Sequence, residues 1–172
     1  LDPRRFGRIL MGKPDFAAWS TLGVDPLVDG LEPARWCAKL QSRHQPIKDV
    51  LLDQTVLAGI GNIQATEALW HAGIAPQTPA NQLDLAALHR LAEGIDWTLQ
   101  RTLRAEAGAE LVYLGDRAAP NPFTIYGRSG EPCPRCEQAL RHIVQSGRTT
   151  TYCATCQPPL RATRQGKARP SS

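Results

Sequence analysis

Two pairs of cysteines near the end of the chain have the spacing of a metal site. Cys133 and Cys136 form one C-x-x-C pair, and Cys153 and Cys156 form a second pair after sixteen intervening residues. Each pair can present two thiolates to one ion from a tight turn, and the intervening segment is long enough for a two-stranded ribbon. Two disulfides are the alternative, but a C-x-x-C pair closed on itself is strained and typical of redox catalysis. The spacing therefore predicts one structural Zn²⁺ ion bound by four thiolates.

A second candidate site lies where two glycines interrupt an apolar helical pattern. Gly59 and Gly61 let the backbone approach a ligand closely. The free N–H groups at the start of the following helix can bind an anion such as a phosphate. We expect Asn62 to cap this helix and to donate its side-chain amide to a phosphate oxygen, with Lys48 supplying positive charge. A tight turn between helices also needs glycines, so the glycines alone leave both interpretations open.

The segments that must position these sites are mainly helical. Apolar residues recur every three or four positions in four segments, and Asp84 precedes the longest of them as a candidate N-cap. We expect these helices at 33–41, from Pro46 to the break at Gly59, at 63–73 and at 85–107. We expect short strands at 8–12, 139–144 and 148–152, the last two joined by a turn at 145–147. The predicted fold class is mainly α, a helical bundle followed by a small β-ribbon.

Charge is distributed unevenly along the 172 residues, whose formal net charge is +4. Residues 1–13 have a net charge of +3 and residues 116–172 a net charge of +6, whereas residues 14–115 have a net charge of −5. Two basic ends around an acidic centre favour a local phosphate-binding surface over a uniformly basic protein. We expect the tail after Gln157 to be disordered and to make at most a loose contact with a polyanion.

Composition restricts the class of protein further. With 42% hydrophobic residues, the chain can form one moderate domain and one small metal-stabilised domain. No stretch is apolar enough to predict a membrane span, so we expect no membrane partner. A metal-bound cysteine set with one further thiol, Cys37, suits the reducing cytoplasm. The chain begins at Leu1 without an initiator methionine, and we suspect a piece of a longer protein.

Three motifs in one order resemble a known family. Residues 47–54, 59–63, 67–69 and 72–76 together resemble the helix-two-turn-helix region of the formamidopyrimidine-DNA glycosylase and endonuclease VIII family. Residues 126–136 with 152–157 resemble the zinc finger at the C-terminal end of that family. Residues 2–7 resemble the loop before the last strand of its N-terminal β-sandwich, so 8–12 would be a remnant strand of that sandwich.

The resemblance implies roles for individual residues. Lys48, Asn62 and the backbone at Gly61 would bind phosphates beside a damaged nucleotide. Arg148, at the ribbon turn, would donate two hydrogen bonds to the same bend of the DNA backbone. Removal of a base requires extrusion of its nucleotide, and the gap in the stack must then be filled. In this interpretation Phe6 is a wedge between bases, and Arg4 faces the unpaired partner base.

The chain also departs from the pattern of the family. The nucleophile that the resemblance implies is an N-terminal proline amine followed by a glutamate, with a lysine on a sandwich hairpin, and we expect all of these upstream of Leu1. Pro3 is no substitute, because its nitrogen is a tertiary amide. The chain as given is therefore expected to bind DNA without cutting it. Residues 105–123 differ from the 8-oxoguanine-binding loop of the formamidopyrimidine branch, which leaves the lesion open.

These observations predict four regions: a sandwich remnant at 1–13, a helix-two-turn-helix DNA-binding domain at 14–115, a four-cysteine zinc finger at 116–157 and a disordered tail at 158–172. The implied function is base-excision repair, as part of a monomeric bacterial DNA glycosylase and abasic-site lyase acting by β,δ-elimination near the nucleoid. Its partner would be double-stranded DNA containing an oxidised base or an abasic site. One alternative is a non-catalytic, zinc-containing DNA-binding module. A helix-hairpin-helix glycosylase is another, but it has no place for the ribbon.

Overall fold

The computed structural model describes residues 20–106 and 121–159. The expected strand at 8–12, the gap-filling residues Arg4 and Phe6, and all of the expected tail after Pro159 lie outside the described residues.

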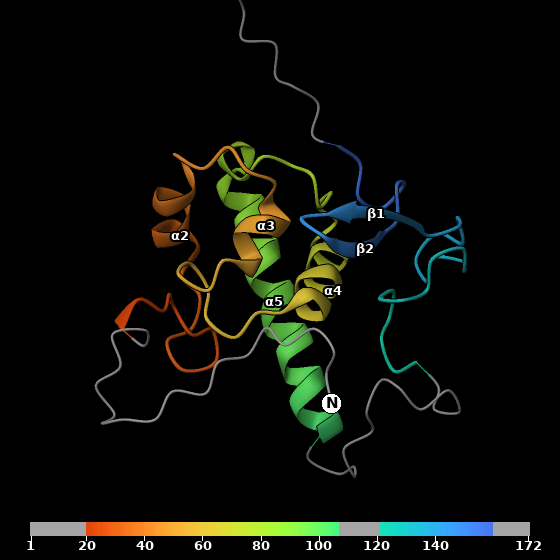
Figure 1. Cartoon of the computed structure of the whole chain (residues 1–172), viewed down its shortest axis with the longest axis horizontal. Coiled ribbons are helices and arrows are strands. Elements are labelled where there is room, and N and C mark those ends of the chain that lie inside the picture. Colours follow the sequence, from red (N-terminus) through yellow and green to blue (C-terminus); the bar gives the residue numbers. More distant parts are fainter. Residues whose placement is uncertain (1–19, 107–120, 160–172) are drawn as a thin grey trace, which may run out of the picture.

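Helices dominate the described part of the chain, and a two-stranded ribbon follows them (Figure 1). The order is α2 (Pro33–Leu40), α3 (Ile47–Leu52), α4 (Asn62–Ala72), a 3₁₀ turn (Ala80–Gln82), α5 (Leu85–Glu106), β1 (Arg141–Gln145) and β2 (Arg148–Tyr152). The predicted mainly α class with a small β-ribbon is therefore confirmed. None of the helices in the described ranges is both long and apolar enough to cross a membrane.

The long helix α5 is the centre of the bundle, with α2 and α4 packed against it. Its first turn is capped as predicted, because Asp84 Oδ1 accepts the backbone N–H of Ala87 at 2.7 Å. Helix α4 crosses α5 closely at Gly94, where a Cβ atom would lie only 2.6 Å from the carbonyl oxygen of Ala68. A larger residue at this position would push the two helices apart. The core residues of α5 follow helical spacing and include Leu88, Leu91 and Ile95.

Helix α3 is shorter than predicted, since it ends at Leu52 and does not continue to the glycines. Asp53 Oδ1 accepts the backbone N–H of Thr55 at 3.0 Å and its hydroxyl at 2.6 Å, which stabilises a turn in place of another helical turn. Leu57 is buried as its apolar character suggested, but it lies in this turn and forms an isolated bridge with Val24. Burial of an apolar residue thus does not require the helix to extend.

The ribbon is antiparallel, and Gln145 pairs with Arg148 at its closed end. Ser146 and Gly147 both have positive φ, 49° and 72°, which matches a two-residue hairpin turn that follows the strand twist. The first strand begins at Arg141, two residues later than predicted. Ala139 lies outside the strand because it forms a bridge with Pro132 in the cysteine loop.

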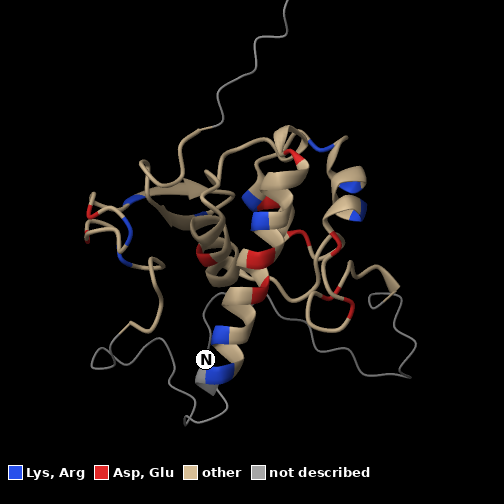
Figure 2. Cartoon of the chain, turned by 180° about the vertical axis from the view of Figure 1, so that it is seen from behind, with Lys and Arg blue, Asp and Glu red and all other residues tan. Residues whose placement is uncertain are grey.

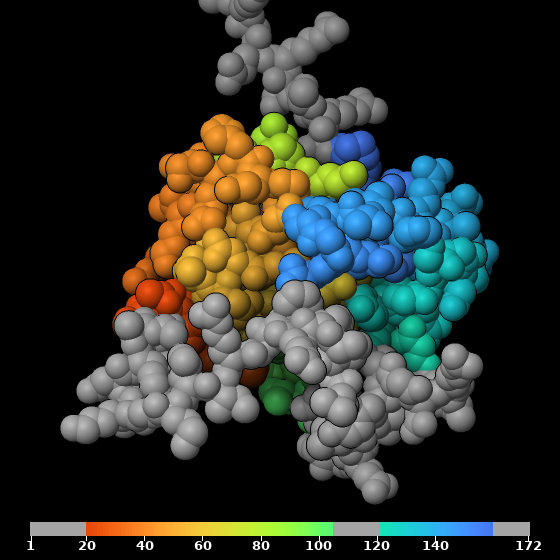
Figure 3. All heavy atoms as spheres, in the orientation of Figure 1, coloured from red at the N-terminus to blue at the C-terminus, as the bar shows by residue number. Residues whose placement is uncertain are grey.

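A second, smaller core joins the ribbon region to α4. It contains Trp70 from α4 together with Ile125, Cys133, Leu140 and Cys153. In the space-filling view the ribbon lies directly against the surface formed by α3 and α4 (Figure 3). The zinc finger and the predicted phosphate site at the start of α4 are therefore neighbours in the structure.

Candidate nucleic-acid interface and metal centre

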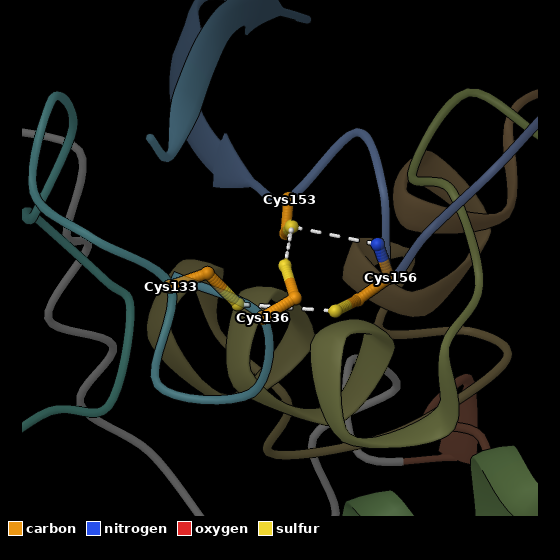
Figure 4. A group of neighbouring side chains, drawn as sticks. All are labelled: Cys133, Cys136, Cys153 and Cys156. Carbon is orange, nitrogen blue, oxygen red and sulfur yellow. Dashed lines mark hydrogen bonds between the residues drawn. The ribbon is translucent and has the colours of Figure 1, made fainter. Parts of the chain in front are cut away.

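The four cysteines converge on one point between the loop 132–139 and the turn that follows β2 (Figure 4). All four Sγ atoms lie within 4.8 Å of one another. The Sγ atoms of Cys133 and Cys156 are 3.9 Å apart, and those of Cys136 and Cys153 are 3.5 Å apart. Four sulfur atoms at about 2.3 Å from a zinc ion would have similar separations in a tetrahedron. The cluster is a structural zinc site, since four thiolates leave no open position on the ion.

The protein lowers the pKa of one cysteine in the cluster and raises the pKa of two others. Burial acts to raise the pKa of Cys133, but the amides of Arg135 and Cys136 and the Trp70 indole outweigh it and lower the pKa to about 6. Burial raises the pKa of Cys153 and of Cys156, and neighbouring thiols add to that effect. A bound zinc ion would supply positive charge that favours the thiolate forms, so its binding would release protons.

The zinc region is fastened to the C-terminal end of α4. Arg135 donates hydrogen bonds to the carbonyl oxygens of Trp70 (2.8 Å) and His71 (2.9 Å), and its guanidinium lies 4.1 Å from the Trp70 ring centroid. Both carbonyls lie in the last turn of α4, where the Trp70 oxygen also accepts the N–H of the C-cap residue Gly73. Gln157 is buried, accepts the N–H of Cys153 and donates to the carbonyl of Ile74 at 2.8 Å. Movement of the cysteine loops would therefore disturb α4.

The Gln54 side chain helps to hold the turn between α3 and α4 that contains the two glycines. Gln54 Oε1 accepts the N–H of Gly59 at 2.9 Å, and its Nε2 donates to the carbonyl of Ile60 at 3.0 Å. Gly59 has φ +79°, a conformation that other residues rarely adopt. The N–H groups of Asn62, Ile63 and Gln64 have no acceptor among the described residues. The first turn of α4 thus keeps the free amides that an anion site requires.

Lys48, on α3, lies next to this turn, and its side chain is fully buried. Its Nζ donates to Asn62 Oδ1 and to Thr150 Oγ1, both at 2.5 Å. The pKa of the ammonium is lowered to about 8, mainly by burial; Asp49 opposes this shift and Arg148 adds to it. Asn62 also donates from Nδ2 to the carbonyl oxygen of Thr149 at 3.1 Å. Lys48 and Asn62 therefore join α3, α4 and β2 at one point.

Two details of this site differ from expectation. Asn62 does not cap α4: Gly61 occupies the N-cap position, and Asn62 is the first helical residue. Its Oδ1, the atom that a cap would use, accepts the hydrogen bond of Lys48 Nζ instead, and its Nδ2 donates to the ribbon. Lys48 is fully buried, so its ammonium contacts Asn62 and Thr150 and acts on the surface only through its electric field. Arg148, by contrast, is exposed at the ribbon turn, as the motif required.

The charged residues of α5 do not extend this surface. Seen from behind, α5 has acidic residues (Glu93 and Asp96) between Arg90 and the pair Arg101 and Arg104, so its charges of one sign do not run along the whole helix (Figure 2). The basic groups predicted to bind phosphate are instead concentrated where the ribbon meets the α3–α4 turn. Sequence patterns alone missed the residues that join the two parts, above all Glu67, Arg135 and Gln157. A glutamate between the apolar residues Ala65 and Leu69 of α4 was the clearest available signal.

Comparison with known proteins agrees with both parts of this surface. Residues 22–112 match the formamidopyrimidine-DNA glycosylase H2TH domain, and residues 130–159 match the zinc finger found in FPG and IleRS. The first match alone covers more than half of the chain. The chain therefore belongs to the formamidopyrimidine-DNA glycosylase and endonuclease VIII family.

Among similar sequences, formamidopyrimidine-DNA glycosylase of Chloroflexus aurantiacus is 39% identical over 91% of this chain, and that of Methylobacillus flagellatus is 37% identical over 94%. The chain spans only 58% and 61% of the length of these two relatives.

Solved structures give the same picture. MutM (Fpg) of Thermus thermophilus matches with a TM-score of 0.76 and 33% identity, covering 92% of this chain and 63% of that one. Lactococcus lactis Fpg in complex with DNA containing an abasic site matches with a TM-score of 0.71 and 33% identity, covering 82% and 53%.

Proposed function

We propose that this chain binds damaged double-stranded DNA in base-excision repair, as part of a bacterial DNA glycosylase with abasic-site lyase activity. The relatives are formamidopyrimidine-DNA glycosylases, and one matched structure is a complex with DNA containing an abasic site. The proposal places the protein in the cytoplasm beside the chromosome, acting as a monomer on DNA with an oxidised base or an abasic site. It divides the chain into the four regions at 1–13, 14–115, 116–157 and 158–172.

One observation supports this proposal best: Lys48, Asn62 and the start of β2 meet at a single point. The free amides of the α4 N-terminus begin at Asn62 itself, and the exposed Arg148 begins β2 and is near enough to lower the pKa of Lys48. Asn62 Nδ2 donates one hydrogen to Thr149 and has a second one to offer. This hydrogen, the backbone amides and two cations together suit the oxygens of successive phosphates. In this proposal the backbone at Gly61 and the Asn62 amides bind one phosphate, Arg148 binds its neighbour, and the buried Lys48 adds positive charge.

The chemical steps are assigned to the whole protein. Base removal followed by strand cleavage through a Schiff base needs an amine nucleophile, a group that handles protons and residues that fill the vacated stack. The proposed gap-filling residues are Phe6 and Arg4. The chain spans about three fifths of the length of its relatives. We therefore propose that these 172 residues bind the DNA and that the part of the relatives that this chain does not match completes the catalytic pocket.

Fluorescence anisotropy with labelled duplexes tests the proposed function. One duplex contains a tetrahydrofuran abasic-site analogue and a matched duplex does not, and each is titrated at several salt concentrations. We expect affinity to fall steeply with salt, with a slope that corresponds to several phosphate contacts, and to be higher for the abasic duplex. Binding that is insensitive to salt would contradict the phosphate assignment. Equal affinity for both duplexes would instead favour a DNA-binding module without a role in lesion recognition.

Borohydride reduction tests whether the nucleophile lies in these 172 residues or in the rest of the full-length protein. We expect the 172-residue polypeptide to leave no covalent complex with abasic DNA beyond that of an unrelated basic protein. A polypeptide extended at its N-terminus to the full length of the relatives should be trapped. Stoichiometric trapping by the shorter polypeptide would show that one of its own amines, such as Lys48, is the nucleophile.

A further inference from the structure

A carboxylate inside the protein joins α4 to the segment that leads into the zinc finger. Glu67 is 2% exposed. Its Oε1 accepts the backbone N–H groups of Ile125 (2.8 Å) and Tyr126 (2.9 Å), and its Oε2 accepts that of Thr124 (2.9 Å). Three successive amides thus converge on one side chain almost sixty positions away in the sequence.

In the described part of the chain, the carboxylate has no hydrogen-bond partners besides these amides. Among the described residues no lysine or arginine forms an ion pair with Glu67. Removing a carboxylate from water is costly, and three charge-assisted hydrogen bonds from a concave run of amides offset that cost. Such an arrangement requires the segment to hold one conformation, because each amide must point at the same two oxygen atoms.

The segment that Glu67 holds is stabilised from the other side as well. Asn121 Nδ2 donates to the carbonyl of Tyr126 at 2.7 Å, and Asn121 Oδ1 accepts the N–H of Phe123 at 2.9 Å. Arg101 on α5 donates to the carbonyl of Pro122 at 2.5 Å. Ile125 is completely buried and packs in the small core that contains Cys133 and Cys153. Residues 121–126 are therefore held in one conformation at the point where the chain enters the zinc finger.

Helix α4 consequently holds the zinc finger at three levels. Asn62 contacts the ribbon at the N-terminal end, Glu67 holds residues 124–126 near the middle, and Trp70 and His71 accept the hydrogen bonds of Arg135 at the C-terminal end. Only the first level belongs to the proposed phosphate site. The middle level is buried and cannot touch DNA, but it fixes the ribbon relative to the free amides of α4.

We propose that Glu67 is a positioning residue for DNA binding: its carboxylate sets the placement of the zinc finger, and so of Arg148, relative to the phosphate-binding turn at Gly61 and Asn62. Because this role is measured through DNA binding, it rests on the proposed function. Glu67 acts from the protein interior and does not contact the nucleic acid.

A Glu67→Gln variant tests this proposal. The amide has only one acceptor oxygen, so its NH₂ group must face at least one of the three N–H donors. The matched control is Glu93→Gln, which removes the same charge from an exposed position on α5. Affinity for the tetrahydrofuran duplex is measured across a salt series, and zinc content is measured on the same samples.

We expect Glu67→Gln to bind one zinc ion and to lose affinity about tenfold or more, since small misplacements of binding groups have effects of this size. The dependence of log affinity on log salt should keep its wild-type slope, because the phosphate contacts still form in the bound state. Glu93→Gln should match the wild type. Wild-type affinity in a zinc-loaded Glu67→Gln variant would overturn the proposal, and so would a slope reduced like that of a lost phosphate contact.

Glu67→Asp gives an answer if Glu67→Gln does not fold. The aspartate keeps the charge but is one methylene shorter, so we expect bound zinc and an affinity between those of the wild type and a positioning-deficient variant. Full affinity would overturn the proposal. Amide hydrogen exchange of the wild type gives a readout without DNA: Thr124, Ile125 and Tyr126 should be as protected as the ribbon, and rapid exchange would contradict the inference. A wild type that binds no DNA but shows this protection would refute the proposed function alone.

Discussion

The ammonium nitrogen of Lys48 lies 2.5 Å from the hydroxyl oxygen of Thr150, although 102 positions separate the two residues in the sequence. One comes from the helical bundle and the other from the zinc ribbon. The contact is buried, and its other branch runs to Asn62 at the proposed phosphate site. A charged group inside the interface between two parts of a protein is costly for folding, which suggests that it is retained for binding.

Replacing Lys48 with methionine should therefore stabilise the fold and weaken DNA binding. Methionine fills a similar volume without a buried charge, but Asn62 Oδ1 and Thr150 Oγ1 lose their donor. The Asn62 side chain lies near the surface turn and the Thr150 hydroxyl can rotate, so we expect a net rise of at most about 1 kcal/mol in the free energy of unfolding at pH 7. DNA affinity should fall, because the charge below the phosphates is lost. Urea denaturation and anisotropy on the same samples measure both effects. A methionine variant that is less stable and binds normally would contradict the assignment.

The pH dependence of stability should differ between the wild type and Lys48→Met. The pKa of Lys48 is about 8 in the folded protein and 10.5 in the reference state. Between these values the unfolded chain binds the proton more tightly, so the free energy of unfolding of the wild type should rise with pH relative to the variant. The difference between the two proteins should change by at most about 3 kcal/mol from pH 7 to pH 10.5. Denaturation curves at several pH values check the sign.

Arg148→Ala should weaken DNA binding by about 1 to 3 kcal/mol and reduce the salt slope by about one phosphate contact. The control is Arg141→Ala, which removes an equally exposed arginine from the far end of the same ribbon. We expect a smaller change there, since Arg141 is paired with Tyr152 away from the turn. Equal losses from both variants would indicate a diffuse electrostatic effect in place of a specific contact.

The sequence predicted the elements whose local chemistry is strong. The helices expected at 33–41, 63–73 and 85–107 have such boundaries: α2 begins at Pro33, α4 ends at a left-handed Gly73, and Asp84 caps α5. The sequence pattern gave the wrong end for α3, where a side chain forms hydrogen bonds that replace those of a further helical turn. Asp53 ends α3 early by bonding Thr55, and the apolar spacing of Leu57 gave no sign of that turn.

The metal centre was predictable because its four ligands occur as two short local patterns. The connections between the zinc finger and the bundle were not, because each joins residues far apart in the chain. The amides bound by Glu67 belong to residues 124–126, and the acceptor for Gln157 is the carbonyl of Ile74. Backbone groups have no residue-specific signal in a sequence. Only the three-dimensional arrangement shows that a buried glutamate has partners there.

Gly94→Ala should destabilise the helical bundle. Alanine favours a helix by about 1 kcal/mol over glycine, but its Cβ would lie 2.6 Å from the backbone oxygen of Ala68 and would force α4 away from α5. We expect a net loss of about 1 to 3 kcal/mol in the free energy of unfolding. Glu93→Ala, at the neighbouring exposed position, should be nearly neutral or slightly stabilising. Thermal or urea denaturation of both variants measures the difference, and a stabilised Gly94→Ala protein would show that the two helices are not in close contact.

Removal of zinc should abolish DNA binding without unfolding α5. The ion holds the two cysteine loops together, and Arg135 and Gln157 transmit their position to α4. A Cys153→Ser variant should bind clearly less than one zinc ion per chain, lose the dispersion of ribbon signals in NMR spectra and retain most helical circular dichroism. Cys37→Ser is the matched control, since that thiol lies in α2 and outside the cluster, and it should keep one zinc ion and full affinity. If the Cys153→Ser variant kept full DNA affinity after treatment with a chelator, then the ribbon could not be part of the binding surface, and Arg148 would lose its proposed role.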